Sequence, residues 1–238
     1  RYLALSGMFF GLGAASKWTC IYAGGGLAVI WLVYWITQRK TPHFVRRFFA
    51  NCAFCLLFFV AIPLAIYYVS YYHYGTASGL DGGINMFFTR DYFDIVWDNQ
   101  VYMLTYHEGV HTPHPYESYW YEWIFDGRPI LYYRDLDYAN TEGIKSLFAS
   151  FNNPLVSWTG LLAFFAMVIE AIRKKSGKAL FILIAILSQF VPWLFIGRIL
   201  FAYHYFPSEV FMVLALCHMW RRCRDEGLYK WYRPMYAF

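Results

Sequence analysis

Charged side chains are scarce in this sequence. Asp, Glu, Lys and Arg make up 15% of its 238 residues, and 59% are hydrophobic, whereas soluble domains carry about 25% charged residues. Long apolar runs accompany the deficit, which excludes an ordinary soluble domain and indicates a polytopic membrane protein. The net charge of +5 does not indicate nucleic-acid binding, because the positive residues fall in short segments between apolar runs.

The sequence also lacks the patterns that metal and phosphate sites often use. Cys52 and Cys55 form a C-x2-C pair inside an apolar run, and a zinc ribbon would need a second pair. The glycines at 24–26 lie in another apolar run, where they favour close helix packing over a phosphate-binding loop. We therefore expect neither a zinc ribbon nor a nucleotide loop.

The histidines of the polar region are poor candidates for a metal site. His107 and His111 could face one side of a helix and share a zinc ion. However, Gly109, Pro113 and Pro115 would interrupt such a helix, and the spacing lacks the H-E-x-x-H order of zinc hydrolases. We expect no metal site here.

Six apolar runs divide the chain. Residues 1–69 hold three, a polar region of residues 70–153 follows, and residues 154–238 hold three more and a basic tail. The sequence predicts an all-α polytopic membrane protein with about six transmembrane helices and one large external loop containing interfacial helices. The runs are Tyr2–Ser16, Ile21–Ile36, Phe48–Val69, Leu155–Ile172, Ala179–Ile196 and Leu200–Trp220.

The charges predict which face each loop occupies. Segments 38–47, 173–178 and 221–224 hold four, four and three Lys/Arg, and six alternating crossings place all three on one side. The opposite side receives residues 70–153, with eleven Asp/Glu against four Lys/Arg. By the positive-inside rule the basic segments are cytoplasmic and the large loop is external. We expect a multi-pass protein of the plasma membrane whose active face is external.

Residues 84–106 of the polar region have a helical pattern. Asp91, Asp94 and Asp98 fall on one face at positions i, i+3 and i+7. We interpret this as an amphipathic helix in the plane of the membrane interface, with its acids toward water. A solvated face explains these acids better than catalysis does, because every helix with a wet side has such pairs.

Two cations at the external ends of the apolar runs indicate a site. Lys17 follows the first run, and Arg198 lies between the fifth and sixth runs, six residues before His204. An ionisable residue at membrane depth is a functional hypothesis, and cations there suit an anionic lipid headgroup, whose phosphate oxygens arginine binds bidentately. The alternative is snorkelling, in which the charge only reaches the interface along its own stem.

A second indication lies in residues 111–123, where prolines prevent a long helix and His, Glu, Trp and Tyr alternate. This stiff, aromatic-rich segment stands between strongly apolar regions, and neither an apolar core nor a flexible linker requires such side chains. We interpret it as part of a site at a membrane surface.

Six motifs follow one another along nearly the whole chain. Residues 114–123 read HPYESYWYEW and are followed by RPI at 128–130 and by two tyrosines at 132–133. The others read GLGAASKW, MLTYH, NPLVSW, SQFVPW and RILFAYHYFPS, at residues 11–18, 103–107, 153–158, 188–193 and 198–208. In these motifs the chain resembles the protein O-mannosyltransferase family of multi-span GT-C glycosyltransferases. The polar region has no sugar-binding insertion of the MIR type, and in this respect the chain resembles the bacterial members of the family.

The resemblance implies an activity. Members of this family transfer mannose from polyprenyl-phosphate-mannose to Ser or Thr hydroxyls of acceptor proteins, with inversion, on the external face. A hydroxyl acceptor needs a carboxylate base, and the leaving lipid phosphate needs cations or donors. Neither role requires a metal or another cofactor. The family's acidic catalytic pair precedes the region represented here, so the chain, which starts at Arg1 in an apolar run, is expected to be a C-terminal portion that is inactive alone.

The resemblance also suggests roles for particular residues. One group of residues is expected to contact the carrier phosphate, and a second group is expected to shape the sugar or acceptor pocket. Lys17, placed in the first group, could support either role. The phosphate group is Arg198, Tyr203, His204 and Lys17, and the pocket group is His114, Glu117 and Trp120.

Three alternatives remain open at this point. Another GT-C enzyme could transfer a lipid-phosphate-linked sugar to a lipid or wall polymer. A transporter would carry ionisable residues near mid-membrane, whereas Glu170 and Glu209 lie near the ends of the apolar runs. The third alternative is a structural membrane subunit, which would not explain why the polar region contains a His- and Trp-rich segment. A dimer partner is possible in each case.

Overall fold

The computed structural model describes residues 1–134 and 147–227. Part of the expected external loop (135–146) and the end of the expected basic tail (228–238) lie outside the described residues. The chain forms two compact units, Arg1–Val110 and His111–Phe238. The described residues are mostly helical, which confirms the predicted all-α membrane fold.

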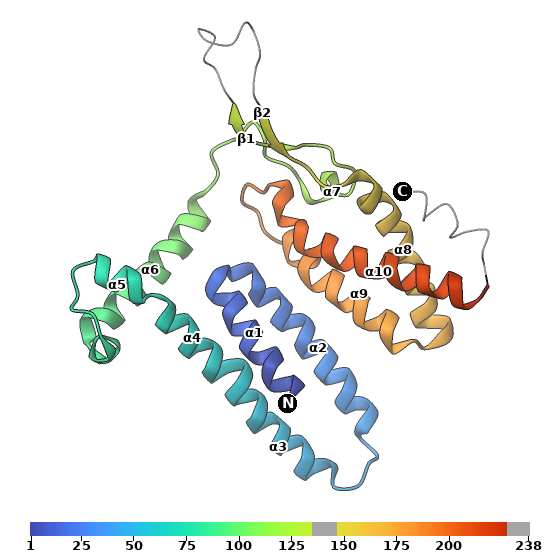
Figure 1. Cartoon of the computed structure of the whole chain (residues 1–238), viewed down its shortest axis with the longest axis horizontal. Helices are drawn as coiled ribbons and strands as arrows, with labels where there is room; N and C mark the ends of the chain where they lie inside the picture. Colours follow the sequence, from blue (N-terminus) through green and yellow to red (C-terminus); the bar gives the residue numbers. More distant parts are fainter. Residues whose placement is uncertain (135–146, 228–238) are drawn as a thin grey trace, which may run out of the picture. The chain divides into compact units, whose positions relative to one another are not determined.

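The first unit contains the helices α1 to α6 (Figure 1). Short 3₁₀ helices at Trp18–Cys20 and Ile84–Phe88 precede α2 and α6, and a π-helical turn at Leu57–Ala61 joins α3 to α4. Helix α1 packs along α4 and also contacts α2. The bounds are α1 Tyr2–Ser16, α2 Ile21–Gln38, α3 Phe44–Leu56, α4 Ile62–Ser70, α5 Tyr72–Ala77 and α6 Arg90–Gly109.

Two glycines allow α1 to approach its neighbour closely. Gly7 and Gly11 form a G-x-x-x-G pair on α1, and both are buried. A Cβ at Gly7 would overlap the backbone carbonyl of Phe58, and a Cβ at Gly11 would lie 2.8 Å from the Cα of Pro63. Pro63 lacks an N–H and disturbs the preceding turn, which accounts for the π-helical turn just before it. Small residues therefore fix this helix contact.

Replacing Gly7 by alanine should lower the melting temperature of the protein. The added Cβ would force α1 away from Phe58, and overpacking of this kind costs about 1–3 kcal/mol. Gly25→Ala is the matched control, because a Cβ there meets nothing within 4 Å. Thermal unfolding in detergent should separate the two variants. Equal melting temperatures would contradict the close packing of α1.

Helix α6 starts later than its sequence pattern predicts. The pattern indicated a helix from Ile84, but residues Ile84–Phe88 form a 3₁₀ helix and α6 begins at Arg90. The reason is a cap: the Thr89 side chain accepts a hydrogen bond from the Tyr92 N–H at 3.3 Å, which favours a helix start at this point. Asp91 and Asp98 are exposed, as expected for the solvated face.

The second unit contains a three-helix group, a short helix and a two-stranded hairpin (Figure 1). The strands β1 (Ile130–Arg134) and β2 (Leu147–Ser150) pair antiparallel, and the sequence pattern did not predict them. The helices are α7 Trp120–Trp123, α8 Pro154–Lys174, α9 Gly177–Phe190 and α10 Phe206–Asp225, with 3₁₀ helices at Val191–Leu194 and Ala202–His204.

Four helical segments of the described residues are long and apolar enough to cross a membrane: Trp18–Gln38, Phe44–Ala77, Pro154–Lys174 and Gly177–Leu194. The other two expected crossings differ. Helix α1 is apolar but has 15 residues. The last helix was expected to begin at Leu200 but begins at Phe206, because Pro207 favours the first turn of a helix. The count of six crossings therefore stays a prediction.

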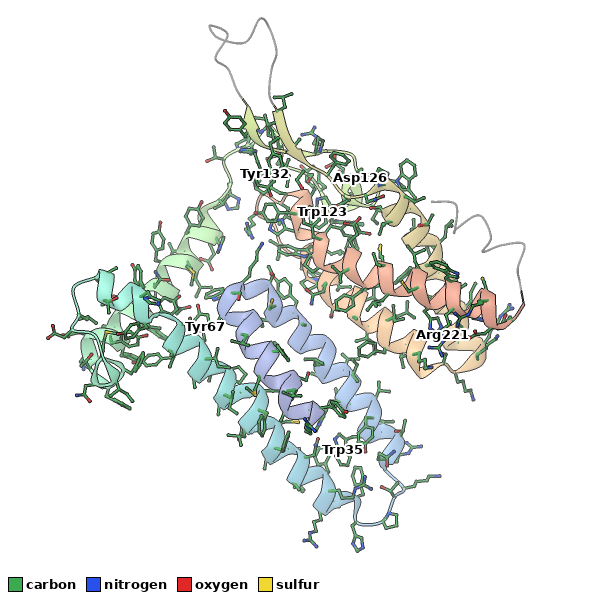
Figure 2. All side chains as sticks on the ribbon, in the orientation of Figure 1. Trp35, Tyr67, Trp123, Asp126, Tyr132 and Arg221 are labelled. Carbon is green, nitrogen blue, oxygen red and sulfur yellow. The ribbon has the colours of Figure 1, made fainter. Side chains whose placement is uncertain are left out.

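An ion-pair cluster ties together the basic ends of α8 and α10. The buried Glu170 accepts from the Arg222 guanidinium at 2.6 Å and lies 3.1 Å from the Nε2 of His218. Glu226 pairs with Arg222 and with Lys174, both at 2.9 Å. These partners hold the pKa of the Glu226 carboxyl below its usual value, Arg222 contributing most. The cluster lies at the end of the three-helix group marked by Arg221, opposite Trp123 and Asp126 (Figure 2).

Candidate functional site

The segment before α7 forms a turn that its own side chains brace. The Glu117 N–H donates to the carbonyl of His114 at 2.9 Å, and the Glu117 carboxylate accepts from the His114 N–H at 3.1 Å. The Nδ1 of His114 accepts from the Tyr116 N–H at 3.2 Å. A neutral His114 in this arrangement carries its proton on Nε2, so the exposed ring can present a hydrogen-bond donor.

This turn is joined to the segment that follows α9. The Ser118 N–H donates to the carbonyl of Leu200 at 2.9 Å, and the rings of His114 and Phe201 meet edge-to-face with centroids 5.2 Å apart. The half-buried Arg198 stands two residues before Leu200, and its guanidinium donates to the Ile199 carbonyl at 3.4 Å. Two motifs that are about 80 residues apart in the sequence are thus side by side.

Trp123 forms the core below this junction (Figure 2). It is 1% exposed, and its Nε1–H donates to the Ser118 hydroxyl at 2.9 Å. Its ring lies against Trp193, His204 and Tyr205, with centroid distances of 6.1 to 6.4 Å. The last residue of the HPYESYWYEW motif therefore packs on residues from two other motifs and fixes the turn against them.

His204 is buried between aromatic rings. It is 3% exposed, with the Trp193 centroid at 4.1 Å and the Tyr203 centroid at 4.2 Å. Its Nδ1 lies 3.1 Å from the backbone nitrogen of Phe201. Burial and this local contact favour a positioning role, in which His204 holds the 198–204 turn. Tyr203 is partly exposed, and its ring stacks on that of Phe201.

The pocket residues have different surroundings. The half-buried Trp120 meets the ring of Phe190 edge-to-face at 6.0 Å. Arg128 donates to the Glu117 carbonyl at 3.3 Å and lies 3.8 Å from the Glu122 carboxylate. Arg128, which lies just before β1, therefore holds the 114–117 turn in place. The sequence did not indicate this contact.

Lys17 belongs to the first unit. It is exposed, ends α1 with an extended backbone, and its N–H donates to the Gly13 carbonyl at 2.9 Å. Its supporting role stays a prediction. The other residues selected from the sequence, His114, Glu117, Trp120, Arg198, Tyr203 and His204, all belong to the second unit.

Within residues 1–134 and 147–227, no three His, Cys, Asp or Glu side chains gather in a way that could hold a metal ion. His107 belongs to α6 in the first unit, whereas His111 and His114 belong to the second.

Two half-buried acids, Asp126 and Glu209, were not recognised from the sequence as parts of the site. Asp126 follows α7 with a left-handed backbone (φ 52°), and its Oδ2 is buried without a partner among the described residues. Glu209, in the first turn of α10, accepts from the Asn153 N–H and the Ser157 hydroxyl, each at 3.2 Å. The Glu209 and Asp126 carboxyls also interact electrostatically. Through these interactions the two acids connect three segments: the residues after α7, the start of α8 and the start of α10.

Asp126→Asn should stabilise the protein at neutral pH. Burial raises the pKa of Asp126 above its usual value of 3.8, although the Asn152 N–H opposes the shift. The folded state therefore holds this proton more tightly than the unfolded chain does. That contribution to stability is full below the unfolded pKa and is lost as pH rises through the folded one. Asparagine cannot ionise, and it tolerates the left-handed backbone.

Thermal unfolding between pH 4 and 8 would check this prediction. The melting temperature of Asp126→Asn should exceed that of the wild type by a margin that grows with pH. A margin that is constant across this range would contradict a titrating buried carboxyl.

Residues 92–233 match the family model described as "C-terminal four TMM region of protein-O-mannosyltransferase". This range includes the 111–123 turn, the 198–208 segment and the helices α7, α8, α9 and α10 of the second unit.

A curated relative is the polyprenol-phosphate-mannose–protein mannosyltransferase of Corynebacterium glutamicum. The two sequences are 24% identical over 214 residues, which include 79% of this chain and 40% of the relative. The chain thus spans well under half the length of that enzyme. No solved structure matches the chain.

Proposed function

Since the chain belongs to the protein O-mannosyltransferase family, we propose that it forms the carrier-binding and acceptor-binding part of such an enzyme. The proposed reaction transfers mannose from polyprenyl-phosphate-mannose to Ser or Thr hydroxyls of proteins, with inversion, on the external face of the plasma membrane. One observation supports it most: the Ser118–Leu200 hydrogen bond joins the HPYESYWYEW motif to the segment that carries Arg198.

Arg198 is the proposed contact of the carrier phosphate. When the mannosyl bond breaks, negative charge develops on the leaving phosphate, and a fixed guanidinium stabilises that charge. The half-buried position of Arg198 strengthens such an interaction relative to an exposed one. Tyr203, in the same 198–204 segment, is proposed to contact the carrier phosphate as well, and His204 would keep the turn in place.

His114, Glu117 and Trp120 would shape the mannose and acceptor pocket. The Nε2–H of a neutral His114 can donate to a sugar hydroxyl or to a phosphate oxygen. Glu117 holds the backbone of His114, so its role is to orient that ring. The flat indole of Trp120 offers an apolar face of the kind that lines ligand pockets.

The base that deprotonates the acceptor hydroxyl is proposed to lie upstream of residue 1. Residues 1–238 expressed alone should therefore bind carrier without transferring mannose. The proposed location of the base does not depend on the role proposed for Arg198.

A transfer assay tests the proposed function. Membranes containing the whole protein would receive polyprenyl-phosphate-[³H]mannose and a Ser/Thr-rich peptide, with a peptide lacking Ser and Thr as the control. Radiolabel should appear on the first peptide only and should be released by alkaline β-elimination as mannose. Label that passes instead into a lipid or polymer fraction would contradict the protein acceptor.

A further inference from the structure

Helix α6 is fastened to the end of a membrane-spanning helix by tyrosines. The Tyr92 hydroxyl donates to the Tyr68 carbonyl at 2.7 Å, and the Tyr67 hydroxyl donates to the Gln100 side chain at 2.6 Å. The Tyr71 hydroxyl adds a contact to Asn99 at 3.0 Å. Tyrosines 67, 68 and 71 lie in the last turns of the Phe44–Ala77 segment, where an aromatic belt marks a membrane–water interface.

The same contacts define which face of α6 is already occupied. Tyr92 and Val96 are buried in a cluster with Met86, and the cluster packs on Tyr68 and Tyr72. Gln100, one turn further along α6, is hydrogen-bonded to Tyr67 and Tyr71, so the occupied face extends to this residue. One side of α6 is therefore held against the end of the membrane-spanning segment Phe44–Ala77.

A second face of α6 is apolar and uncovered. Phe93, Trp97, Val101 and Leu104 are 53%, 59%, 47% and 51% exposed. At about 100° per residue they fall within about 80° of the helix circumference. The rings of Phe93 and Trp97 are stacked, with an interplanar angle of 9°. Asp91, Asp94 and Asp98 lie beside this stripe on the side away from the buried face.

An open groove continues the stripe toward the span. Its volume is about 460 Å³, and it is walled chiefly by aromatic rings, with Arg90 and Asp94 at its polar rim. The aromatic residues that line it are Tyr68, Phe87, Phe88 and Phe93. Phe93 belongs to both surfaces, so stripe and groove form one apolar area.

We propose that membrane lipid covers this area, so that α6 lies half immersed in the interface with Phe93, Trp97, Val101 and Leu104 among the lipid chains. Three observations select lipid over water or protein. The area is continuous with a membrane-spanning helix, α6 is hydrogen-bonded to the tyrosines at the end of that helix, and the exposed acids Asp91 and Asp98 lie along the edge of the area. A helix with an apolar face and a charged edge partitions into the interface in this way. The proposal does not depend on the enzymatic activity.

Site-directed spin labelling of the whole protein tests this proposal. The background replaces Cys20, Cys52, Cys55, Cys217 and Cys223 by serine or alanine, and single cysteines are introduced along α6. The labelled protein is reconstituted in liposomes of phosphatidylcholine and phosphatidylglycerol. Collisions of each label with oxygen, which concentrates in lipid, are compared with those of a water-soluble nickel chelate. The six labelled positions, 91, 93, 97, 98, 101 and 104, are all exposed, so labels should not disturb the fold.

Labels at 93, 97, 101 and 104 should collide more with oxygen than with the chelate, and labels at 91 and 98 should do the reverse. The adjacent pair Trp97→Cys and Asp98→Cys gives the sharpest contrast. Chelate-dominated collisions at all six positions would place the stripe in water and overturn the proposal. Immobile labels that meet neither reagent at 93 and 97 would show that protein covers the stripe, which also overturns it.

Discussion

Arg198→Ala is expected to reduce mannose transfer about 100- to 1,000-fold while the protein still inserts and folds. Removing one fixed donor that stabilises developing negative charge typically costs this much. The side chain is half-buried, and among residues 1–134 and 147–227 its guanidinium has one hydrogen-bond acceptor, the neighbouring Ile199 carbonyl at 3.4 Å, so its loss should disturb the fold little. The measurement is initial transfer rate against carrier concentration, with melting temperature as the folding control.

Two further variants sharpen this test. Arg198→Lys keeps the charge but not the bidentate geometry, so it should recover a part of the activity. Arg173→Ala removes an exposed arginine from the end of α8 and should transfer mannose as the wild type does. Wild-type turnover by Arg198→Ala would remove the phosphate role assigned to this residue.

Trp123→Ala is expected to have the largest effect on stability and to abolish transfer with it. The indole is 1% exposed and contacts residues from both motifs of the site. Removing a large buried aromatic side chain costs about 3–5 kcal/mol, a large share of the stability of a typical domain. The melting temperature should fall by several degrees, and protease should cleave within residues 111–134.

Its controls separate packing from hydrogen bonding. Tyr121→Ala removes an exposed aromatic residue two positions away and should leave the melting temperature unchanged. Ser118→Ala keeps the indole but removes the acceptor of its N–H, and an unpaired buried donor costs about 1–3 kcal/mol. Its effect should fall between those of the other two. A Trp123→Ala protein as stable as the wild type would contradict the role of this core.

The sequence predicted the parts of this molecule that depend on local composition. Four of the six apolar runs coincide with helical segments long enough to cross a membrane, since bilayer thickness sets that length. The helical pattern of residues 84–106 predicted most of α6. The charge at the end of an apolar run selected Arg198 as a site residue, and the family resemblance selected His114. Their roles remain predictions, but the Ser118–Leu200 hydrogen bond brings their segments together.

What the sequence did not predict depends on contacts between distant residues. Asp126 and Glu209 are ordinary acids in the sequence and become a pair only when α10 meets the segment after α7. Likewise, Ile130–Arg134 has no nearby partner strand, and its pairing with residues 147–150 crosses a long connection. The buried state of His204, set by Trp193 and Tyr203, could not be read from its position in the motif either.

Photoaffinity labelling tests most directly whether the two motifs form the carrier site. A polyprenyl phosphate with a diazirine next to the phosphate would be irradiated with the whole protein in liposomes, and the labelled peptides would be mapped by mass spectrometry. We predict labels within residues 111–123 and 198–208, with both lost in Arg198→Ala and retained in Arg173→Ala. Labels confined to the basic segments 38–47, 173–178 or 221–224 would contradict the proposed site.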